Sequence, residues 1–190
     1  MTDAYRRACA ALDIPRIETE RLILRGFRIE DAADLARIHG DAEVVRFLGG
    51  TRDASLTGAF DKIAAYLGHW SVRGCGKWAV EDKATGRVVG RSGYNDYPFG
   101  WPGLELGWTF ARDHWGKGYA AEAARSALAW GFTVLRADRI VSMIHPDNTA
   151  SQAVARKLGE TPWRAHDHEG STHVLWSMTR TAWLSRAGAA

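Results

Sequence analysis

The sequence has little cysteine and no long hydrophobic run. Its two cysteines, Cys9 and Cys75, are too few among 190 residues for a disulfide framework and lack the spacing of a metal site. Sparse cysteine is typical of the reducing cytoplasm, and we interpret Cys75 as a small loop residue rather than a nucleophile. No apolar run reaches membrane-spanning length, and no signal-peptide core is present. We therefore expect a cytoplasmic protein without a membrane partner.

The sequence also lacks a strong excess of either charge. Lys and Arg number 25 and Asp and Glu number 22, so the formal net charge is +3. The basic residues are scattered and form no polybasic stripe, so we expect no nucleic-acid partner. The small positive excess instead suits an anionic small-molecule ligand.

No internal repeat, low-complexity segment or linker divides the chain. A length of 190 residues suits one domain with a proper core. Residues 3–12 form a short amphipathic pattern that ends before Pro15. We therefore expect residues 1–15 to form a helical extension and residues 16–190 to form a single domain.

Strand and helix patterns follow one another in mixed order along this domain. The predicted strands cover residues 21–25, 77–81, 87–94, 104–110, 140–144, 162–164 and 173–178. The predicted helices cover residues 30–39, 41–48, 56–70, 120–134 and 148–159. This order predicts an α/β (mixed α+β) fold, in which helices flank a central sheet.

Residues 112–122 are the most informative stretch of the sequence. Gly116 and Gly118 bracket Lys117 between the strand pattern of residues 104–110 and a strong helical pattern. A strand, a glycine turn and a helix start bring several backbone N–H groups together, and the helix dipole adds positive charge. An anion, most often a phosphate, is the expected ligand of such a loop.

Three phosphate-binding patterns compete for this loop. A nucleotide P-loop fails twice, because Gly118 follows Lys117 and position 111 is Ala111. A dinucleotide fingerprint fits the glycines, but Asp138 precedes its strand instead of ending it, which speaks against an oxidoreductase. The third pattern, Gln/Arg-x-x-Gly-x-Gly/Ala, fits at Gly118 and Ala120 and departs at Trp115.

The third pattern is the pyrophosphate loop of the GNAT acyltransferases. Over residues 16–184 the chain resembles the RimJ/RimL-type branch of that superfamily, which is ribosomal-protein N-acetyltransferase-like. The resemblance rests on the order and spacing of several blocks: Glu18–Arg25, Glu30–Asp31, Gly86–Gly90, Glu105–Trp108, Trp115–Ala123, His145–Ser151 and Lys157–Gly159. It implies the GNAT fold, in which a mixed sheet splays open and the cofactor lies in the V-shaped gap.

The resemblance also implies how acetyl-CoA is bound. The loop Trp115, Gly116, Lys117, Gly118, Tyr119 and Ala120 would hold the pyrophosphate. The backbone of Trp108, Thr109 and Phe110 would pair with the pantetheine arm as an added strand does, and Asn148 would contact the same arm. Helix capping is the alternative role for Asn148.

Acyl transfer to an amine needs a base for the amine and an acid for the departing thiolate. Glu105 is the candidate base, although an exposed residue at a strand edge is an equal alternative. The tyrosine that many GNAT enzymes use as the acid is replaced by Ala155. Ser151, in the first turn of the same helix, is the candidate acid, with capping as its alternative role.

The resulting hypothesis is an acetyl-CoA-dependent N-acetyltransferase that acts through a ternary complex. The acceptor is a protein N-terminus or a small amine, and a non-catalytic acyl-CoA-binding module is the alternative. Trp101 and Trp108 either line the acceptor site or belong to the core. A solvated turn explains the histidines near residues 166–173 better than a metal site, so no metal is expected. Homodimers are frequent among similar proteins, which leaves a homodimer open.

Overall fold

The computed structural model describes residues 12–49, 52–97, 101–168 and 170–187. Most of the predicted N-terminal extension, residues 1–11, lies outside this range. No helix in the described ranges is long and apolar enough to cross a membrane.

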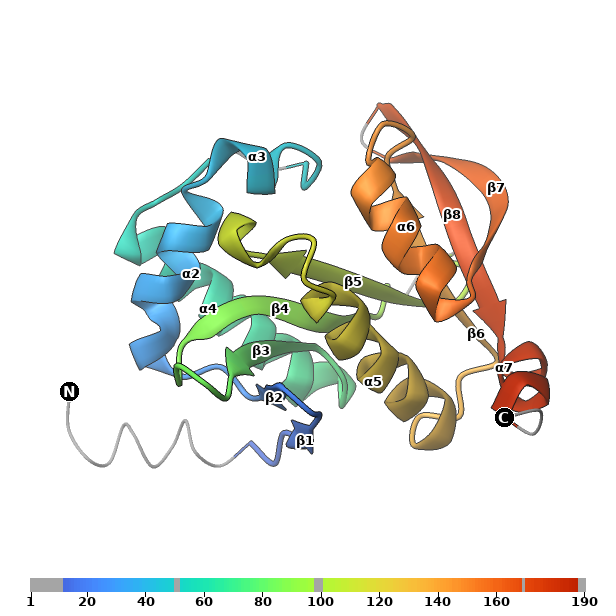
Figure 1. Ribbon diagram of the computed structural model, residues 1–190, viewed down its shortest axis with the longest axis horizontal. Helices are drawn as coiled ribbons and strands as arrows, with labels where there is room; N and C mark the ends of the chain where they lie inside the picture. Colours follow the sequence, from blue (N-terminus) through green and yellow to red (C-terminus); the bar gives the residue numbers. More distant parts are fainter. Residues whose placement is uncertain (1–11, 50–51, 98–100, 169, 188–190) are drawn as a thin grey trace.

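Eight strands form one sheet in the order β1-β2-β3-β4-β5-β6-β8-β7 (Figure 1). They are β1 (Ile17–Glu18), β2 (Leu22–Arg25), β3 (Lys77–Asp82), β4 (Val88–Asn95), β5 (Leu104–Phe110), β6 (Arg139–Ile144), β7 (Thr161–His168) and β8 (Ser171–Thr179). β5 and β6 run parallel, and every other neighbouring pair runs antiparallel. The mixed sheet that the sequence predicts is therefore confirmed.

Helices cover both faces of this sheet (Figure 1). They are η1 (Ile29–Asp31), α2 (Ala32–His39), α3 (Ala42–Val45), α4 (Leu56–Arg73), η2 (Arg112–His114), α5 (Tyr119–Thr133), α6 (Thr149–Leu158) and α7 (Arg180–Ala187). One face packs against α2 and α4 through residues such as Ala79 and Val88, and the other packs against α5 through Leu106 and Phe110. α6 packs on the β6 side of the sheet. We call these two surfaces the α2/α4 face and the α5/α6 face.

Small residues let α5 lie close to the sheet. Ala123, Ala124 and Ala127 are fully buried, and a Cβ added to Gly131 would lie 2.2 Å from the Tyr94 hydroxyl oxygen. Phe132 completes the buried side of the helix. Burial of such side chains is the main source of stability, at about 25 cal/mol for each Å² of apolar surface.

The sequence also predicts that Val134 lies on the packed side of this helix, and this is wrong. Val134 is 59% exposed and is the C-cap residue, one position beyond the end of the helix at Thr133. The sequence also predicts core positions for Trp70, Trp78 and Trp130. The positions of Trp70 and Trp78 are confirmed, since both are buried and their rings meet edge to face with centroids 4.8 Å apart. Trp130 is partly buried and packs against the same rings.

The sheet opens between β5 and β6. The two strands have seven and six residues, yet only Leu104 with Ile140 and Glu105 with Val141 are in register. Beyond these pairs the Ser142 hydroxyl, rather than a backbone ladder, reaches the Leu106 carbonyl at 2.9 Å. Among the described residues, the β6-facing edge of β5 after Glu105 therefore pairs with no strand, and the predicted splayed sheet is confirmed.

Five elements differ clearly from the sequence prediction. The helix expected over residues 41–48 is limited to Ala42–Val45, and the strands near the C-terminus are longer than expected, at Thr161–His168 and Ser171–Thr179. β1 and α7 are not predicted at all. β7 is exposed along most of its length, so it lacks the apolar alternation from which a strand is predicted.

Candidate active site

The glycine loop joins η2 to α5 through two left-handed residues. Gly116 has φ +73° and Gly118, the N-cap of α5, has φ +83°, which glycine adopts without steric cost. No side chain caps this helix, and the N–H groups of Gly116, Lys117 and Gly118 have no acceptor within the described residues. The loop thus offers unpaired donors at a helix N-terminus, as an anion requires.

The side chain of Arg21, which directly precedes β2, contacts this loop. Its guanidinium Nε donates to a Glu122 carboxylate oxygen at 2.7 Å, and its Nη1 donates to the Lys117 carbonyl at 2.9 Å. Thr19 donates to the same carboxylate at 2.6 Å. Burial raises the pKa of Glu122, but these hydrogen bonds outweigh it and lower the pKa overall. Glu122 therefore positions the loop, and the sequence analysis misses its partner Arg21.

The unpaired edge of β5 presents the backbone of alternate residues. Ala111 donates its N–H to Val89 of the β4 segment at 2.9 Å, so the antiparallel alternation turns the N–H of Thr109 toward β4 as well. The N–H groups of Trp108 and Phe110 then face the opening. The carbonyl of Phe110 already accepts from the indole of Trp115 at 2.8 Å. Of the three predicted pantetheine contacts, two face the opening, and Thr109 does not.

Glu105 lies where β5 and β6 separate, on the α2/α4 face. Its side chain is buried, with 7% of the residue exposed, so the alternative of an exposed edge residue is excluded. The Asn95 side-chain amide donates to one carboxylate oxygen. A Cβ added to Gly107 would lie 3.8 Å from the other oxygen and 3.0 Å from Lys77 Nζ, so both charged groups flank this glycine.

Lys77 is a buried cation beside Glu105 that the sequence analysis misses. Its Nζ donates to the Gly93 carbonyl at 2.9 Å. Burial lowers the pKa of Lys77 to about 8, although the negative charge of Glu105 acts in the opposite direction. A lysine at the start of a strand gives no signal of burial in the sequence, because its neighbourhood depends on glycines from two other strands.

Trp108 points to the opposite face of β5 from Glu105, since side chains alternate along a strand. It packs both with the main core and with Ile144, Ala155 and Trp176 of the β6 side. Its ring therefore spans the opening between the two halves of the sheet. Of the two roles left open for Trp108, the structure supports core packing.

The start of α6 is organised by Asn148. Its side-chain oxygen accepts from the backbone N–H of Ser151 at 3.0 Å, so Asn148 is the N-cap. The Ser151 hydroxyl has no hydrogen-bond partner in the described structure, and Ser151 is therefore not the capping residue. Ala155 is fully buried in the cluster on the β6 side.

Comparison with known proteins assigns this architecture. A family model described as an acetyltransferase (GNAT) domain matches residues 21–161. The chain belongs to this family. An uncharacterized N-acetyltransferase, p20 of Bacillus licheniformis, is 34% identical over 141 residues, which cover 74% of this chain and 79% of the relative. The sequence resemblance and the splayed fold therefore identify a GNAT N-acetyltransferase.

Solved structures agree with this assignment. An acetyltransferase from Agrobacterium tumefaciens str. C58 superposes with a TM-score of 0.76 at 30% identity, over 87% of this chain and 95% of that one. Mycobacterium smegmatis RimJ, solved in complex with CoA-disulfide, shares the fold with a TM-score of 0.71 at 21% identity, over 88% and 89% of the two chains. GNAT acetyltransferases in general use acetyl-CoA as the acetyl donor.

In this GNAT enzyme the buried carboxyl group of Glu160 lies beside Ser142, at the point where β5 and β6 separate. Glu160 is 2% exposed, and one of its oxygens lies 3.1 Å from the Ser142 hydroxyl. That hydroxyl has one proton, so it can donate to the Leu106 carbonyl at 2.9 Å while its oxygen accepts a hydrogen bond from a protonated Glu160. Burial raises the pKa of Glu160 to about 8, which fits a protonated carboxyl group. No sequence motif marks this residue.

A row of aromatic and imidazole rings is connected to Glu105 through Asn95. Asn95, which contacts Glu105, also donates to the Tyr97 hydroxyl at 3.3 Å. From there successive ring contacts follow through Trp101, His166, His168, His173, His145 and Phe47. Among the described residues no group of three or more His, Cys, Asp or Glu side chains is arranged to hold a metal ion. Trp101 thus belongs to a ring-lined wall near Glu105 rather than to the main core.

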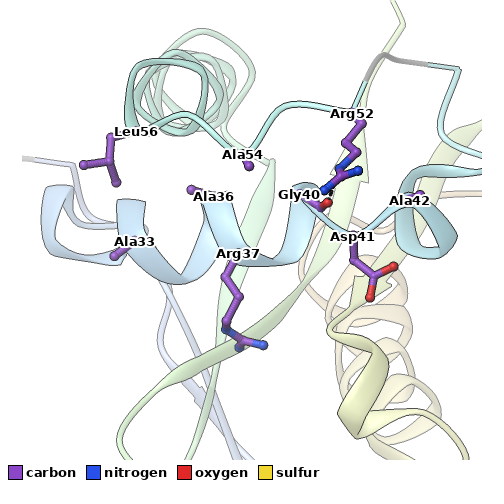
Figure 2. Close-up of a pocket in the computed structure, with 9 residues that line it drawn as sticks. All are labelled: Ala33, Ala36, Arg37, Gly40, Asp41, Ala42, Arg52, Ala54 and Leu56. Carbon is purple, nitrogen blue, oxygen red and sulfur yellow. Dashed lines mark hydrogen bonds between the residues drawn. The ribbon is translucent and has the colours of Figure 1, made fainter.

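A hollow of about 610 Å³ lies elsewhere, along the outer side of α2 (Figure 2). Its charged lining residues are Arg37, Asp41 and Arg52, and none of them is buried. Arg52 donates to the Gly40 carbonyl, and Asp41 caps α3 by accepting from the Glu43 N–H at 2.9 Å. These groups have local structural roles. The candidate active site is therefore the region around β5 rather than this hollow.

Cys75 does not contribute a nucleophile. It is 3% exposed, and burial raises the pKa of its thiol to about 11, so the thiolate that a nucleophile needs is disfavoured. Its interpretation as a small loop residue is confirmed.

Proposed function

We propose that this GNAT enzyme transfers an acetyl group from acetyl-CoA to a primary amine by direct attack while both substrates are bound. One observation carries the proposal. β5 offers unpaired N–H groups at the opening of the sheet and, at the point of opening, the buried carboxylate of Glu105 on the α2/α4 face. In this proposal the N–H groups of β5 bind the acetyl donor at the opening, and Glu105 of the same strand acts on the acceptor amine.

The residues around the opening suit the parts of acetyl-CoA, which supplies an activated acetyl group as a thioester. The loop from Trp115 to Ala120 has the free N–H groups and the helix dipole that a pyrophosphate needs. The N–H groups of Trp108 and Phe110 suit the amides of the pantetheine arm. We propose that Asn148, at the start of α6, contacts the same arm beside its capping role.

Two side chains are proposed to move protons. Glu105 takes a proton from the acceptor amine as the new bond between nitrogen and the acetyl carbon forms. Ser151, whose hydroxyl is free, gives a proton to the sulfur as the bond between carbon and sulfur breaks, and it recovers that proton from water. The acceptor is a protein N-terminus or a small amine.

A thermal-shift experiment tests the donor. Acetyl-CoA at a hundredfold excess over its dissociation constant should stabilise the native state by roughly 2.7 kcal/mol, which is about 5–10 °C for a domain of this size. NAD and ATP at the same concentration should have no effect, because neither of their sequence patterns is complete. Release of coenzyme A in the presence of a panel of amines and N-terminal peptides then tests the transfer itself. Stabilisation by NAD but not by acetyl-CoA would disprove the assignment.

A further inference from the structure

Glu160 occupies a position where an apolar residue is expected. It follows Gly159, which ends α6 with φ +89°, and its backbone N–H donates to the Ala155 carbonyl at 3.0 Å. The residue after such a left-handed glycine commonly makes an apolar contact with the last turn of the helix. Here it carries a buried carboxyl group, and its oxygen Oε2 has no hydrogen-bond partner in the described structure. A buried polar group that is only partly paired costs stability, so packing does not explain it.

The other oxygen of Glu160 belongs to a chain of hydrogen bonds that joins the two halves of the sheet. Its Oε1 lies 3.1 Å from the Ser142 hydroxyl, and that hydroxyl lies 2.9 Å from the Leu106 carbonyl oxygen. Ser142 is on β6 and Leu106 is on β5, each one residue beyond the paired Glu105 and Val141. The chain therefore links β5 to β6 at the point where backbone pairing stops.

The protonation state of Glu160 decides where the Ser142 hydroxyl donates its single proton. A protonated Glu160 donates to the serine oxygen and leaves the serine proton for the Leu106 carbonyl. An ionised Glu160 can only accept, and a carboxylate is a stronger acceptor than an amide carbonyl, so the serine proton turns toward it. The Leu106 carbonyl then loses this donor, and β5 loses its link to β6 at the opening.

The surroundings of Glu160 favour its neutral form. Burial raises the pKa of Glu160 to about 8, and only the hydrogen bond to Ser142 acts in the opposite direction. Its buried neighbour Tyr94 stays neutral over the same range, because burial raises the pKa of that phenol well above its usual value. The cations of the flanking helices are all exposed: Arg125 on α5, Arg156 and Lys157 on α6, and Arg186 on α7.

We propose that Ser142 and Glu160 are positioning residues that hold the opening of the sheet in the shape that binds acetyl-CoA, and that ionisation of Glu160 weakens this binding. The inference rests on the proposed function, in which the N–H of Trp108 contacts the pantetheine arm. Trp108 lies two residues beyond Leu106 on the same edge of β5, since alternate residues face the same way. A hydrogen-bonded Leu106 carbonyl fixes this edge, whereas a released carbonyl leaves it free to move.

The first experiment measures acetyl-CoA affinity by titration calorimetry at pH 7 and pH 9. Glu160→Gln keeps an N–H donor for the Ser142 oxygen but cannot ionise, and Glu30→Gln changes an exposed acid of η1 as a matched control. Wild type and Glu30→Gln should bind about two- to tenfold more weakly at pH 9, as expected for one lost hydrogen bond, and Glu160→Gln should bind equally at both. Equal affinity of wild type at the two pH values would overturn the inference. So would a pH dependence that persists in Glu160→Gln, which would point to another group such as Lys77.

Ser142→Ala separates the hydrogen bond from the charge of Glu160. This variant should bind acetyl-CoA at pH 7 as weakly as wild type does at pH 9, because the Leu106 carbonyl lacks the serine donor at either pH. A thermal melt checks that the variant is folded. A folded Ser142→Ala that binds acetyl-CoA at pH 7 as tightly as wild type would contradict the positioning role.

A third measurement needs neither ligand nor Ser142→Ala. The carbonyl carbon of Leu106 is followed by NMR in the free enzyme from pH 6.5 to 9.5. Its chemical shift should titrate in wild type and stay constant in Glu160→Gln, and a constant shift in wild type would overturn the inference. Failure of acetyl-CoA to bind wild type at either pH instead contradicts the proposed function, and the Leu106 titration still shows whether Glu160 controls this hydrogen bond.

Discussion

Glu105 is proposed as the base because its carboxylate is buried beside Asn95 and Lys77 at the opening of the sheet. Glu105→Gln should lower turnover by about 100- to 10,000-fold, the usual contribution of a positioned base, and should leave acetyl-CoA affinity unchanged. The loss should shrink as pH rises, because more of the acceptor amine is then neutral without help. Steady-state kinetics from pH 6 to 10, with calorimetry for acetyl-CoA, measures both effects.

Glu20→Gln is the matched control for this change, since Glu20 is exposed and makes no contact with the site. It should behave as wild type throughout. If Glu105→Gln is as active as wild type near neutral pH, Glu105 has no part in the mechanism and the acceptor loses its proton to water.

Ser151 can be tested without disturbing its helix. The cap of α6 uses the Asn148 side chain and the Ser151 backbone N–H, so Ser151→Ala keeps the cap and removes only the free hydroxyl. We expect lower turnover with unchanged melting temperature and unchanged acetyl-CoA affinity. Asn148→Ala is the contrasting variant, because loss of this cap should cost about 0.5–2 kcal/mol of stability.

An unchanged turnover in Ser151→Ala would remove the serine from the mechanism. Introducing the tyrosine of related enzymes at position 155 is not a clean rescue. Ala155 is fully buried against Trp176, and a phenol ring there would displace the cluster.

At the scale of elements, the glycine loop depends on the positive φ angles of Gly116 and Gly118. Gly118→Val should weaken acetyl-CoA binding by at least the factor of about 5–30 that corresponds to 1–2 kcal/mol of strain at a positive φ. The fold should persist, because an added Cβ meets only the end of the Arg21 side chain at 3.4 Å. Titration calorimetry with acetyl-CoA and a thermal melt give the two readouts.

Gly86→Val provides the matched control. Gly86 has φ +67°, has no atom within 4 Å of an added Cβ, and lies in the turn between β3 and β4, away from the loop. It should carry similar strain and bind acetyl-CoA normally. An affinity for acetyl-CoA that is equally reduced in both variants would show that general destabilisation, and not the loop, is responsible.

Elements with strong local signals are predictable from the sequence, and so is the order that defines the fold. α4 shows regular apolar spacing between a Ser55 cap and a left-handed Gly74, and the structure has it at Leu56–Arg73. β7 and α7 are missed or shortened because they are largely exposed and lack such spacing. Local pattern predicts an element only where one of its faces is buried.

The surroundings of the candidate base are not predictable in this way. Lys77 lies near Glu105 only because three strands pair in one register and the two glycines Gly93 and Gly107 have no side chains there. A lysine carries no mark of burial in the sequence. The residue types needed for acetyl transfer are therefore readable, whereas the charges that surround them depend on long-range pairing.

At the scale of the whole molecule, Glu160 couples folding to pH. The pKa of this acid is raised in the folded state from 4.5 to about 8, so the native state holds a proton that the unfolded state loses. Its contribution is fully present below about pH 4.5 and is lost as pH rises through about 8. Glu160→Gln should remove this dependence and should be more stable than wild type at pH 8 by up to a few kcal/mol.

Urea denaturation at pH 5.5 and pH 8 checks this prediction. Gln supplies the N–H that the Ser142 hydroxyl oxygen accepts, so the buried hydrogen bond is kept, whereas Glu160→Ala loses it and should be destabilised at both pH values. A Glu160→Gln variant whose stability falls between these pH values as steeply as that of wild type would assign the coupling to another group.

The double use of β5 restricts how this enzyme can change in length. Because side chains alternate along a strand, one inserted or deleted residue between Glu105 and Phe110 would exchange the two faces of everything beyond it. Trp108 would then turn toward the α2/α4 face, and the N–H groups at the opening would turn toward β4. Insertions and deletions in homologous enzymes should therefore fall in the connections and not in this strand. The seven residues of β5 fix the spacing between Glu105 and the N–H groups at the opening.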